Sequence, residues 1–131
     1  MILSYRERKE TVMERVEFIE YKGKKILKID MSNCLENEVF SVIEQAKKVI
    51  FTQPQNSLLT LTDVTHARYN ASVVAAMQVF TKENKRYVRA AAVVGINSIK
   101  RIIFNKIMEA AERELNAFEN AEKAKEWLVS V

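Results

Sequence analysis

The stretch SLLTLTDVTHARYNASVVAAM, residues 57–77, decides the fold of this chain. Its first part is an apolar run in which leucines are interleaved with threonines, as in a strand, and it stops at Asp63. A short polar loop follows, and a helical pattern begins behind Asn70. In an open α/β sheet, ligands and partners bind beyond the carboxyl ends of parallel strands. The sequence therefore predicts that any functional site lies around residues 63–72.

On the amino-terminal side, VEFIEY and KILKID flank a turn at Lys22 and Gly23 and predict a β-hairpin. Its core-facing residues are expected to include Val16, Phe18 and Ile26. Residues 1–15 show no firm period and fit either a frayed helix or an edge strand.

A helix is expected after the hairpin, with Ser32 and Asn33 as candidate caps and Glu36 in a capping-box-like spacing. Gln53 and Pro54 begin the segment that ends it. Its apolar stripe comprises Leu35, Val39, Val42, Ile43, Ala46, Val49 and Ile50.

On the carboxyl-terminal side, Asn70 is expected to cap a helix, and Tyr87 to Val94 read as a buried strand. A third helix begins at Asn97 or Ser98, residues 115–118 form a short strand or link, and Asn120 starts a last helix. The inward residues are expected to be Val73, Val74, Met77 and Phe80, then Ile99, Ile102, Ile103, Ile107 and Ala110, then Ala121, Ala124, Trp127 and Leu128.

The resulting order is ββαβαβαβα, which predicts an α/β fold with a single-layer mixed, mostly parallel sheet of about five strands and four helices. The chain has 131 residues, enough for one domain, so residues 1–131 are expected to form a single domain. With 48% hydrophobic and 29% charged residues, the composition is that of an ordinary globular protein.

Several functional classes are disfavoured by composition. No apolar run approaches the ~20 residues of a membrane span, and the charged start is unlike a secretory signal, so a cytoplasmic location is expected. Two glycines cannot build a phosphate-binding loop, and His66 is the only histidine, so no cofactor and no metal site is expected.

The net charge is 21 − 17 = +4, and the one local basic cluster comprises Lys82, Lys85, Arg86 and Arg89. Cations also suit a solvated helix end, and this reading is preferred to a nucleic-acid or phospholipid patch. Nucleic acid is therefore not expected as a partner.

Three local patterns carry a resemblance: YKGKKILKIDMS before the first helix, NSLLTLTDVT at the centre, and NAFENAEKAKEWL at the end. With AAAVVGI they cover about residues 16–128, and the chain resembles the STAS-domain fold, in particular the SpoIIAA-like (STAS/SEC14 domain-containing) proteins. Members of the anti-sigma-factor-antagonist type are phosphorylated on a serine in a turn that opens a helix. The matching turn here is Asn70, Ala71 and Ser72, with asparagine in place of the usual acid and Val73 in place of the usual glycine.

The resemblance thus implies a non-catalytic, signalling or protein-binding module that contacts a protein partner through residues 66–72. Ser72 is a candidate phosphoacceptor or an ordinary residue of the first helical turn. The candidate partner- or ligand-binding loop consists of Asp63, Thr65, His66, Arg68, Tyr69 and Asn70.

Alternatives remain open at this stage. SEC14-like relatives and the many branched residues suggest a carrier of a small apolar or lipid-like ligand. Tyr69 is either a partner contact or folds back over the core, and Asp63 is expected to anchor its own loop. An enzyme that uses Asp63, or Cys34 with His66 as base, ranks last, because a free cysteine is more often a small buried thiol. A homodimer is also allowed.

Overall fold

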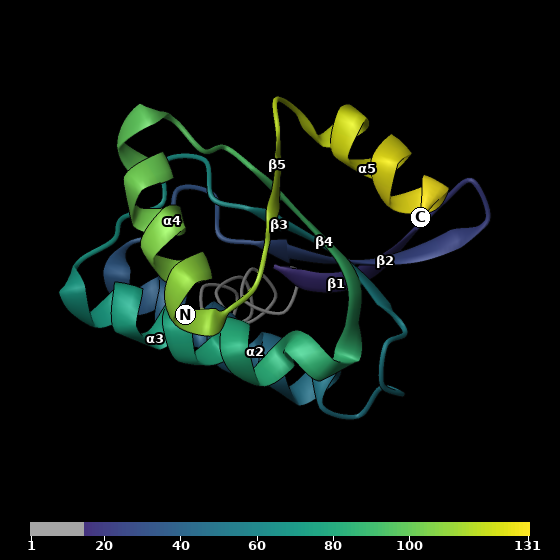
Figure 1. The fold of residues 1–131 in the computed structure, drawn as a ribbon, viewed down its shortest axis with the longest axis horizontal. Coiled ribbons are helices and arrows are strands. Elements are labelled where there is room, and N and C mark those ends of the chain that lie inside the picture. Colours follow the sequence, from purple (N-terminus) through teal and green to yellow (C-terminus); the bar gives the residue numbers. More distant parts are fainter. Residues whose placement is uncertain (1–14) are drawn as a thin grey trace, which may run out of the picture.

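The computed structural model describes residues 15–131, and the predicted order ββαβαβαβα is confirmed (Figure 1). The hairpin is β1 (Val16–Tyr21) and β2 (Lys24–Asp30). It is followed by α2 (Glu36–Ile50), β3 (Leu58–Asp63), α3 (Ala71–Asn84), the short 3-10 helix η1 (Lys85–Tyr87), β4 (Val88–Val94), α4 (Ser98–Ala111), β5 (Asn116–Phe118) and α5 (Ala121–Ser130). The alternatives of a frayed helix or an edge strand concern residues 1–15, which lie almost wholly outside the described part.

The five strands lie in the sheet in the order β1-β2-β3-β4-β5. Only β1 and β2 are antiparallel, and every later neighbour pair is parallel. Since each crossover joins adjacent strands in the same direction, its helix must return over the same face. Accordingly α2, α3 and α4 pack side by side on one face, and α5 covers the other (Figure 1). All three crossover helices therefore begin at the carboxyl ends of the strands.

The core has two unequal layers. Beneath α2, α3 and α4 the buried residues include Val39, Ile43, Val73, Met77 and Phe104. Beneath α5 the layer is thinner and rich in small residues: Ile26, Leu59, Leu61, Ala90, Ala92, Val94, Ala124 and Leu128. Among residues 15–131, no helix is both long and apolar enough to cross a membrane.

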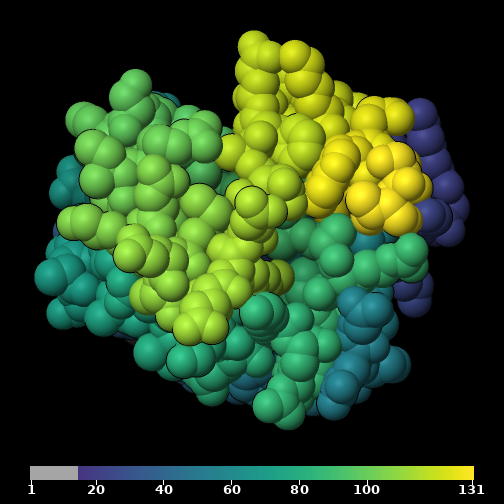
Figure 2. All heavy atoms as spheres, viewed as in Figure 1, coloured from purple at the N-terminus to yellow at the C-terminus, as the bar shows by residue number. Residues whose placement is uncertain are grey.

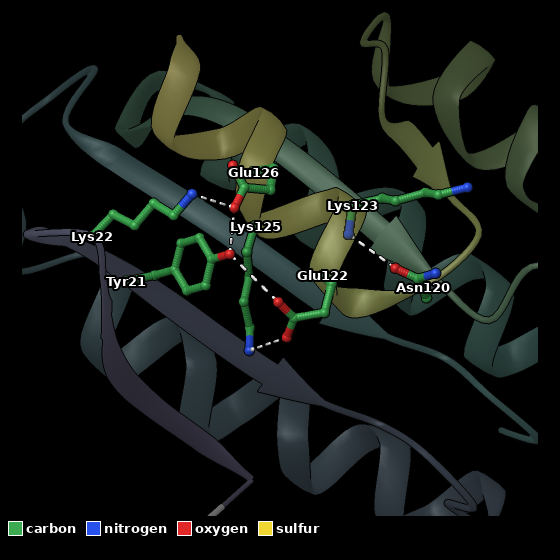
Figure 3. Close-up of polar contacts among 7 residues, drawn as sticks. All are labelled: Tyr21, Lys22, Asn120, Glu122, Lys123, Lys125 and Glu126. Atoms are coloured by element: carbon green, nitrogen blue, oxygen red, sulfur yellow. Dashed lines mark hydrogen bonds and ion pairs between the residues drawn. The ribbon is translucent and has the colours of Figure 1, made fainter.

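A polar cluster fastens α5 to the hairpin (Figure 3). The Tyr21 hydroxyl donates to Glu126 Oε1 at 2.5 Å and lies 3.4 Å from Glu122 Oε2. Lys22 Nζ pairs with Glu126 Oε1 at 2.6 Å, and Lys125 Nζ lies 5.6 Å from the centre of the Tyr21 ring. The hydrogen bond to Glu126 raises the pKa of Tyr21 to about 12. The thin second layer is thus supplemented by surface contacts.

Two local predictions about the first part of the fold are wrong. Phe18 is 42% exposed, because β1 is the outermost strand and Phe18 faces largely into solvent. The cap of α2 is Leu35, not Ser32 or Asn33, and Glu38 accepts the Leu35 N–H at 2.9 Å. Ser32 and Asn33 lie too early because α2 begins only at Glu36, and the Ser32 hydroxyl instead donates to Asp30 Oδ1 at 2.5 Å.

Candidate functional site

Two aspartates end neighbouring parallel strands at the predicted edge. Asp30 of β2 and Asp63 of β3 are register partners, and each turns its Oδ1 back onto its own loop. Asp30 accepts the N–H and O–H of Ser32 at 2.9 and 2.5 Å, and Asp63 accepts those of Thr65 at 2.9 and 2.6 Å. Asp63 therefore anchors its loop, as expected, and Thr65 serves as its partner.

Backbone hydrogen bonds join the loops after β2 and β3, and Gly95, which follows β4, packs against the second of them. The Asn33 N–H donates to the Thr65 carbonyl at 2.8 Å, and the Arg68 N–H donates to the Cys34 carbonyl at 2.9 Å. Gly95, with φ +92°, lies so close to the loop that a Cβ there would be 2.4 Å from the Thr65 nitrogen. The loop of residues 64–70 is therefore held from both sides.

A buried lysine supports this loop from beneath. Lys100 of α4 is 7% exposed, and its Nζ donates to the Val64 carbonyl at 2.7 Å. Desolvation lowers the pKa of Lys100, and the nearby Asp63 carboxylate opposes that shift. Sequence reasoning missed this residue because a charged side chain was not expected inward. The three- and four-residue spacing of Lys100, Phe104, Ile107 and Ala111 could have placed Lys100 on the buried face, since these four are the buried residues of α4.

The loop side chains divide into buried and exposed groups. Tyr69 folds back over the core: its hydroxyl lies 3.9 Å from Met31 Sδ, and its ring centre lies 5.8 Å from that of Phe104. Burial raises the pKa of Tyr69. His66, with φ +57°, and Arg68 are both exposed. Asn70 is exposed as well, so these three side chains of the loop are accessible to a partner, whereas Asp63, Thr65 and Tyr69 are half-buried.

The start of α3 follows the prediction. Asn70 Oδ1 accepts the Val73 N–H at 2.8 Å and caps the helix. Ser72 is exposed in the first turn, two residues after the cap. Its hydroxyl is therefore accessible, which a phosphoacceptor requires and an ordinary first-turn serine also satisfies.

Cys34 is fully buried, as a structural thiol would be. Its Sγ accepts a hydrogen bond from Arg15 Nη1 at 3.0 Å, and burial raises the pKa of the thiol. The exposed His66 is not among the contacts found for Sγ within residues 15–131. Within residues 15–131, therefore, no hydrogen bond joins the thiol to the imidazole, the contact that a cysteine nucleophile with a histidine base would use.

Exposed apolar side chains occupy the same edge. Ile99 and Ile102, in the first turns of α4, are 74% and 61% exposed, and Leu35 at the start of α2 is 48% exposed. The prediction that Ile99, Ile102 and Ala110 line the inner stripe of α4 is therefore wrong. The phase of the helix is set instead by Lys100 and Phe104, which turns the two isoleucines outward. We call Leu35, His66, Arg68, Ser72, Ile99 and Ile102 the carboxyl-edge surface.

Within residues 15–131, no group of three or more His, Cys, Asp or Glu side chains is arranged to hold a metal ion. Comparisons of the chain with protein-family models, with curated proteins and with solved structures returned no match.

Proposed function

We propose that this protein is a non-catalytic regulatory module that binds a protein partner through the carboxyl-edge surface, in the manner that its resemblance to STAS and SpoIIAA-like proteins implies. The observation that carries the proposal is the pair of exposed isoleucines on α4, beside a loop that is fixed on both sides. Exposed large apolar side chains next to polar ones are typical of protein-binding surfaces.

The rigidity of the surface supports binding rather than chemistry. Asp63 uses Oδ1 to hold Thr65, Lys100 is directed to a backbone carbonyl, and Cys34 is enclosed. Asp63 and Lys100 are thus engaged in holding the loop, and the Cys34 thiol is shielded from solvent. A surface that is fixed in advance loses little conformational entropy on binding.

Ser72 supplies a means of regulation. A phosphate added there would carry about −1.5 to −2 charges into the first turn of α3, close to unpaired backbone N–H groups. Where one partner covers both Ser72 and the two isoleucines of α4, the phosphate would also bring charge into an otherwise apolar contact. Phosphorylation is therefore proposed to weaken the complex.

Photo-crosslinking in the cells that make the protein tests this proposal. A photoreactive phenylalanine analogue is placed in turn at Ile99 and at His66, with Val79 as the matched control. Val79 is 54% exposed on α3, eight residues beyond Ala71, which is about 12 Å along the helix axis.

The proposal expects positions 99 and 66 to crosslink the same protein, and Ile102→Asp to abolish both products. Ser72→Glu should weaken them and Ser72→Ala should not. Equal crosslinking from position 79, or no common product from 99 and 66, would contradict the proposed surface. Equal behaviour of the two Ser72 variants would contradict the switch alone.

The alternative, a carrier of a lipid-like ligand, needs space between the sheet and its helices. The cavity lined by Met77, Phe80 and Phe104 measures about 30 Å³, whereas small-molecule sites usually have about 300 Å³ or more. A carrier would therefore require α3 and α4 to separate. Native mass spectrometry of protein from its own cells would favour the carrier if a lipid-sized mass were retained.

A further inference from the structure

The opposite edge of the sheet, where the parallel strands begin, contains an open groove. It has a volume of about 550 Å³, and its lining includes Lys85, Arg89, Ala91, Arg113, Asn116 and Trp127. Figure 2 shows the face on which the yellow α5 and the yellow-green β5 border the green start of β4. We call this hollow the amino-edge groove. Neither its residues nor its position overlap with the carboxyl-edge surface.

The groove exists because β5 is too short to cover β4. Its three residues pair with Ala92, Val93 and Val94 only. On that side no strand among the described residues pairs with Val88–Ala91, so this part of the sheet edge has no strand partner. Arg89 is exposed there, whereas Val88, Ala90 and Ala91 are each 9% exposed or less. The Ala91 carbonyl faces the groove, where Asn116 Nδ2 lies 3.4 Å away, at the long end of hydrogen-bonding distance.

A β-bulge presents a cation at this open edge. Leu58 pairs with Val88 and Leu59 pairs with Ala90, so Arg89 is the extra residue. Bulges often redirect a side chain at a sheet edge. The exposed Arg89 lines both the amino-edge groove and an adjoining groove of about 250 Å³, which also contains Lys24 and Lys25.

The cations that line the two grooves outnumber the carboxylates there. Lys24 Nζ donates to the Val129 carbonyl at 2.9 Å and Lys85 Nζ donates to the Glu112 carbonyl at 2.9 Å, both neutral acceptors. Among residues 15–131, the ion pairs found use none of Lys24, Lys25, Lys85 and Arg89. Glu114 is the one acidic side chain in the lining of either groove.

We propose that the amino-edge groove binds an extended acidic peptide segment of a partner protein, which adds a strand beside Val88–Ala91. The strand edge that has no partner supplies main-chain hydrogen bonds, and the cations receive the carboxylates of alternate side chains. Trp127, half-buried in the wall, provides an apolar contact. An open strand edge favours a peptide over a nucleic acid, whose backbone cannot pair with it.

Fluorescence anisotropy of the full chain with labelled probes tests this inference. The main probe is a peptide of about eight residues in which glutamate and valine alternate, long enough for a typical strand. A second peptide has the same sequence with alternate backbone nitrogens methylated, which removes main-chain donors and keeps the charge. A single-stranded oligothymidylate of similar length is the third probe.

The expected result is binding of the unmodified peptide, with the methylated peptide and the oligonucleotide at least about tenfold weaker. Arg89→Glu should weaken peptide binding by a factor of about ten, because reversing one charge changes one close interaction by roughly 1 to 2 kcal/mol. Lys48→Glu, which reverses an exposed cation on α2, is the matched control and should have no effect.

Any of three results would overturn the inference: no binding of the unmodified peptide at millimolar concentration, equal binding of the methylated peptide, or tighter binding of the oligonucleotide. If Arg89→Glu and Lys48→Glu weakened peptide binding equally, net charge alone would explain the binding, and this result would also overturn the inference. Peptide binding should survive Ile102→Asp. A failure of the amino-edge groove proposal can therefore be distinguished from a failure of the carboxyl-edge surface proposal.

Discussion

Gly95→Ala should destabilise the fold far more than Gly23→Ala, although both glycines have positive φ values of +92° and +79°. An alanine in this backbone region costs roughly 1 to 2 kcal/mol, partly offset by about 0.4 to 1 kcal/mol from the lower entropy of the unfolded chain. This net cost of about 1 kcal/mol is common to both sites.

The two sites differ in what the new methyl group would meet. At Gly23, in the hairpin turn, nothing lies within 4 Å of the added Cβ. At Gly95 the Cβ would lie 2.4 Å from Thr65 N and Oγ1 and 2.7 Å from Thr65 Cα. The Thr65 backbone cannot retreat without stretching its 2.9 Å hydrogen bond to Asp63 Oδ1. Such overpacking adds about 1 to 3 kcal/mol.

Urea unfolding of both variants, followed by circular dichroism, measures the difference. A gap of about 2 kcal/mol, with a slope of about 2 kcal/mol/M, separates the two midpoints by about 1 M. Gly95→Ala should have the lower midpoint, and its slope should match that of Gly23→Ala. Coincident midpoints would refute the reasoning, because they would show that the Thr65 loop yields freely. The carboxyl-edge surface could not then be called rigid.

Three further predictions concern ionisable groups. Burial lowers the pKa of Lys100 in the folded protein below its ordinary value of 10.5. Between the two pKa values the unfolded chain binds more protons than the folded protein, so the free energy of unfolding should rise with pH there. Lys100→Met should remove this rise in urea midpoints measured at several pH values, and a variant whose midpoints rise as steeply as those of the wild type would contradict it. The hydrogen bond from Tyr21 to Glu126 stabilises the fold while the phenol is protonated, so its contribution is complete below about pH 10 and is lost as pH rises through about 12. Glu126→Gln should move the absorbance titration of this phenol toward pH 10. An unchanged titration would show that the hydrogen bond does not form. The buried Cys34 thiol should react with a thiol reagent roughly a hundredfold more slowly in the native than in the urea-unfolded protein, and equal rates would show that the thiol is open.

Much of the fold could be predicted because local pattern and tertiary packing agree. The alternating segments VEFIEY and KILKID form two antiparallel strands, as their pattern predicts. They are joined by a two-residue turn in which Lys22 and Gly23 both have positive φ. Asn70 caps its helix because its short amide reaches Val73 N. The Ala- and Val-rich β4 is covered on both faces, as its lack of polar residues indicated.

The errors occur where tertiary contacts override the local pattern. Helix α4 has apolar residues on two sides, so apolar spacing alone could not fix which side faces inward. The deciding contact is the Lys100 bond to the Val64 carbonyl, 36 residues earlier in the chain. Likewise, Ser32 is a residue type that caps helices, but the helix begins only at Glu36, and Ser32 belongs instead to the turn after β2, where it bonds Asp30.

Where the strand ends and loops of the carboxyl edge lie could be predicted, but which of their side chains are exposed could not. Strand ends and loops are local features, and so Asp63, Thr65, Asn70 and Ser72 could be placed at the carboxyl edge from sequence. Exposure is a property of the packed structure, and for this reason neither the burial of Tyr69 nor the exposure of Ile99 could be chosen in advance. The amino-edge groove was equally hidden, because it arises from the length of β5 relative to β4.

The two edges depend on different parts of the molecule, and this follows from how the helices are distributed. Helices α2, α3 and α4 share the larger core layer and fix the carboxyl-edge surface. One wall of the amino-edge groove instead comes from α5, through Trp127 and Val131. Only Ala124 and Leu128 of α5 are fully buried, and the Tyr21–Glu126 contact holds its outer face (Figure 3). Weakening that contact should therefore loosen the groove before it disturbs the opposite edge.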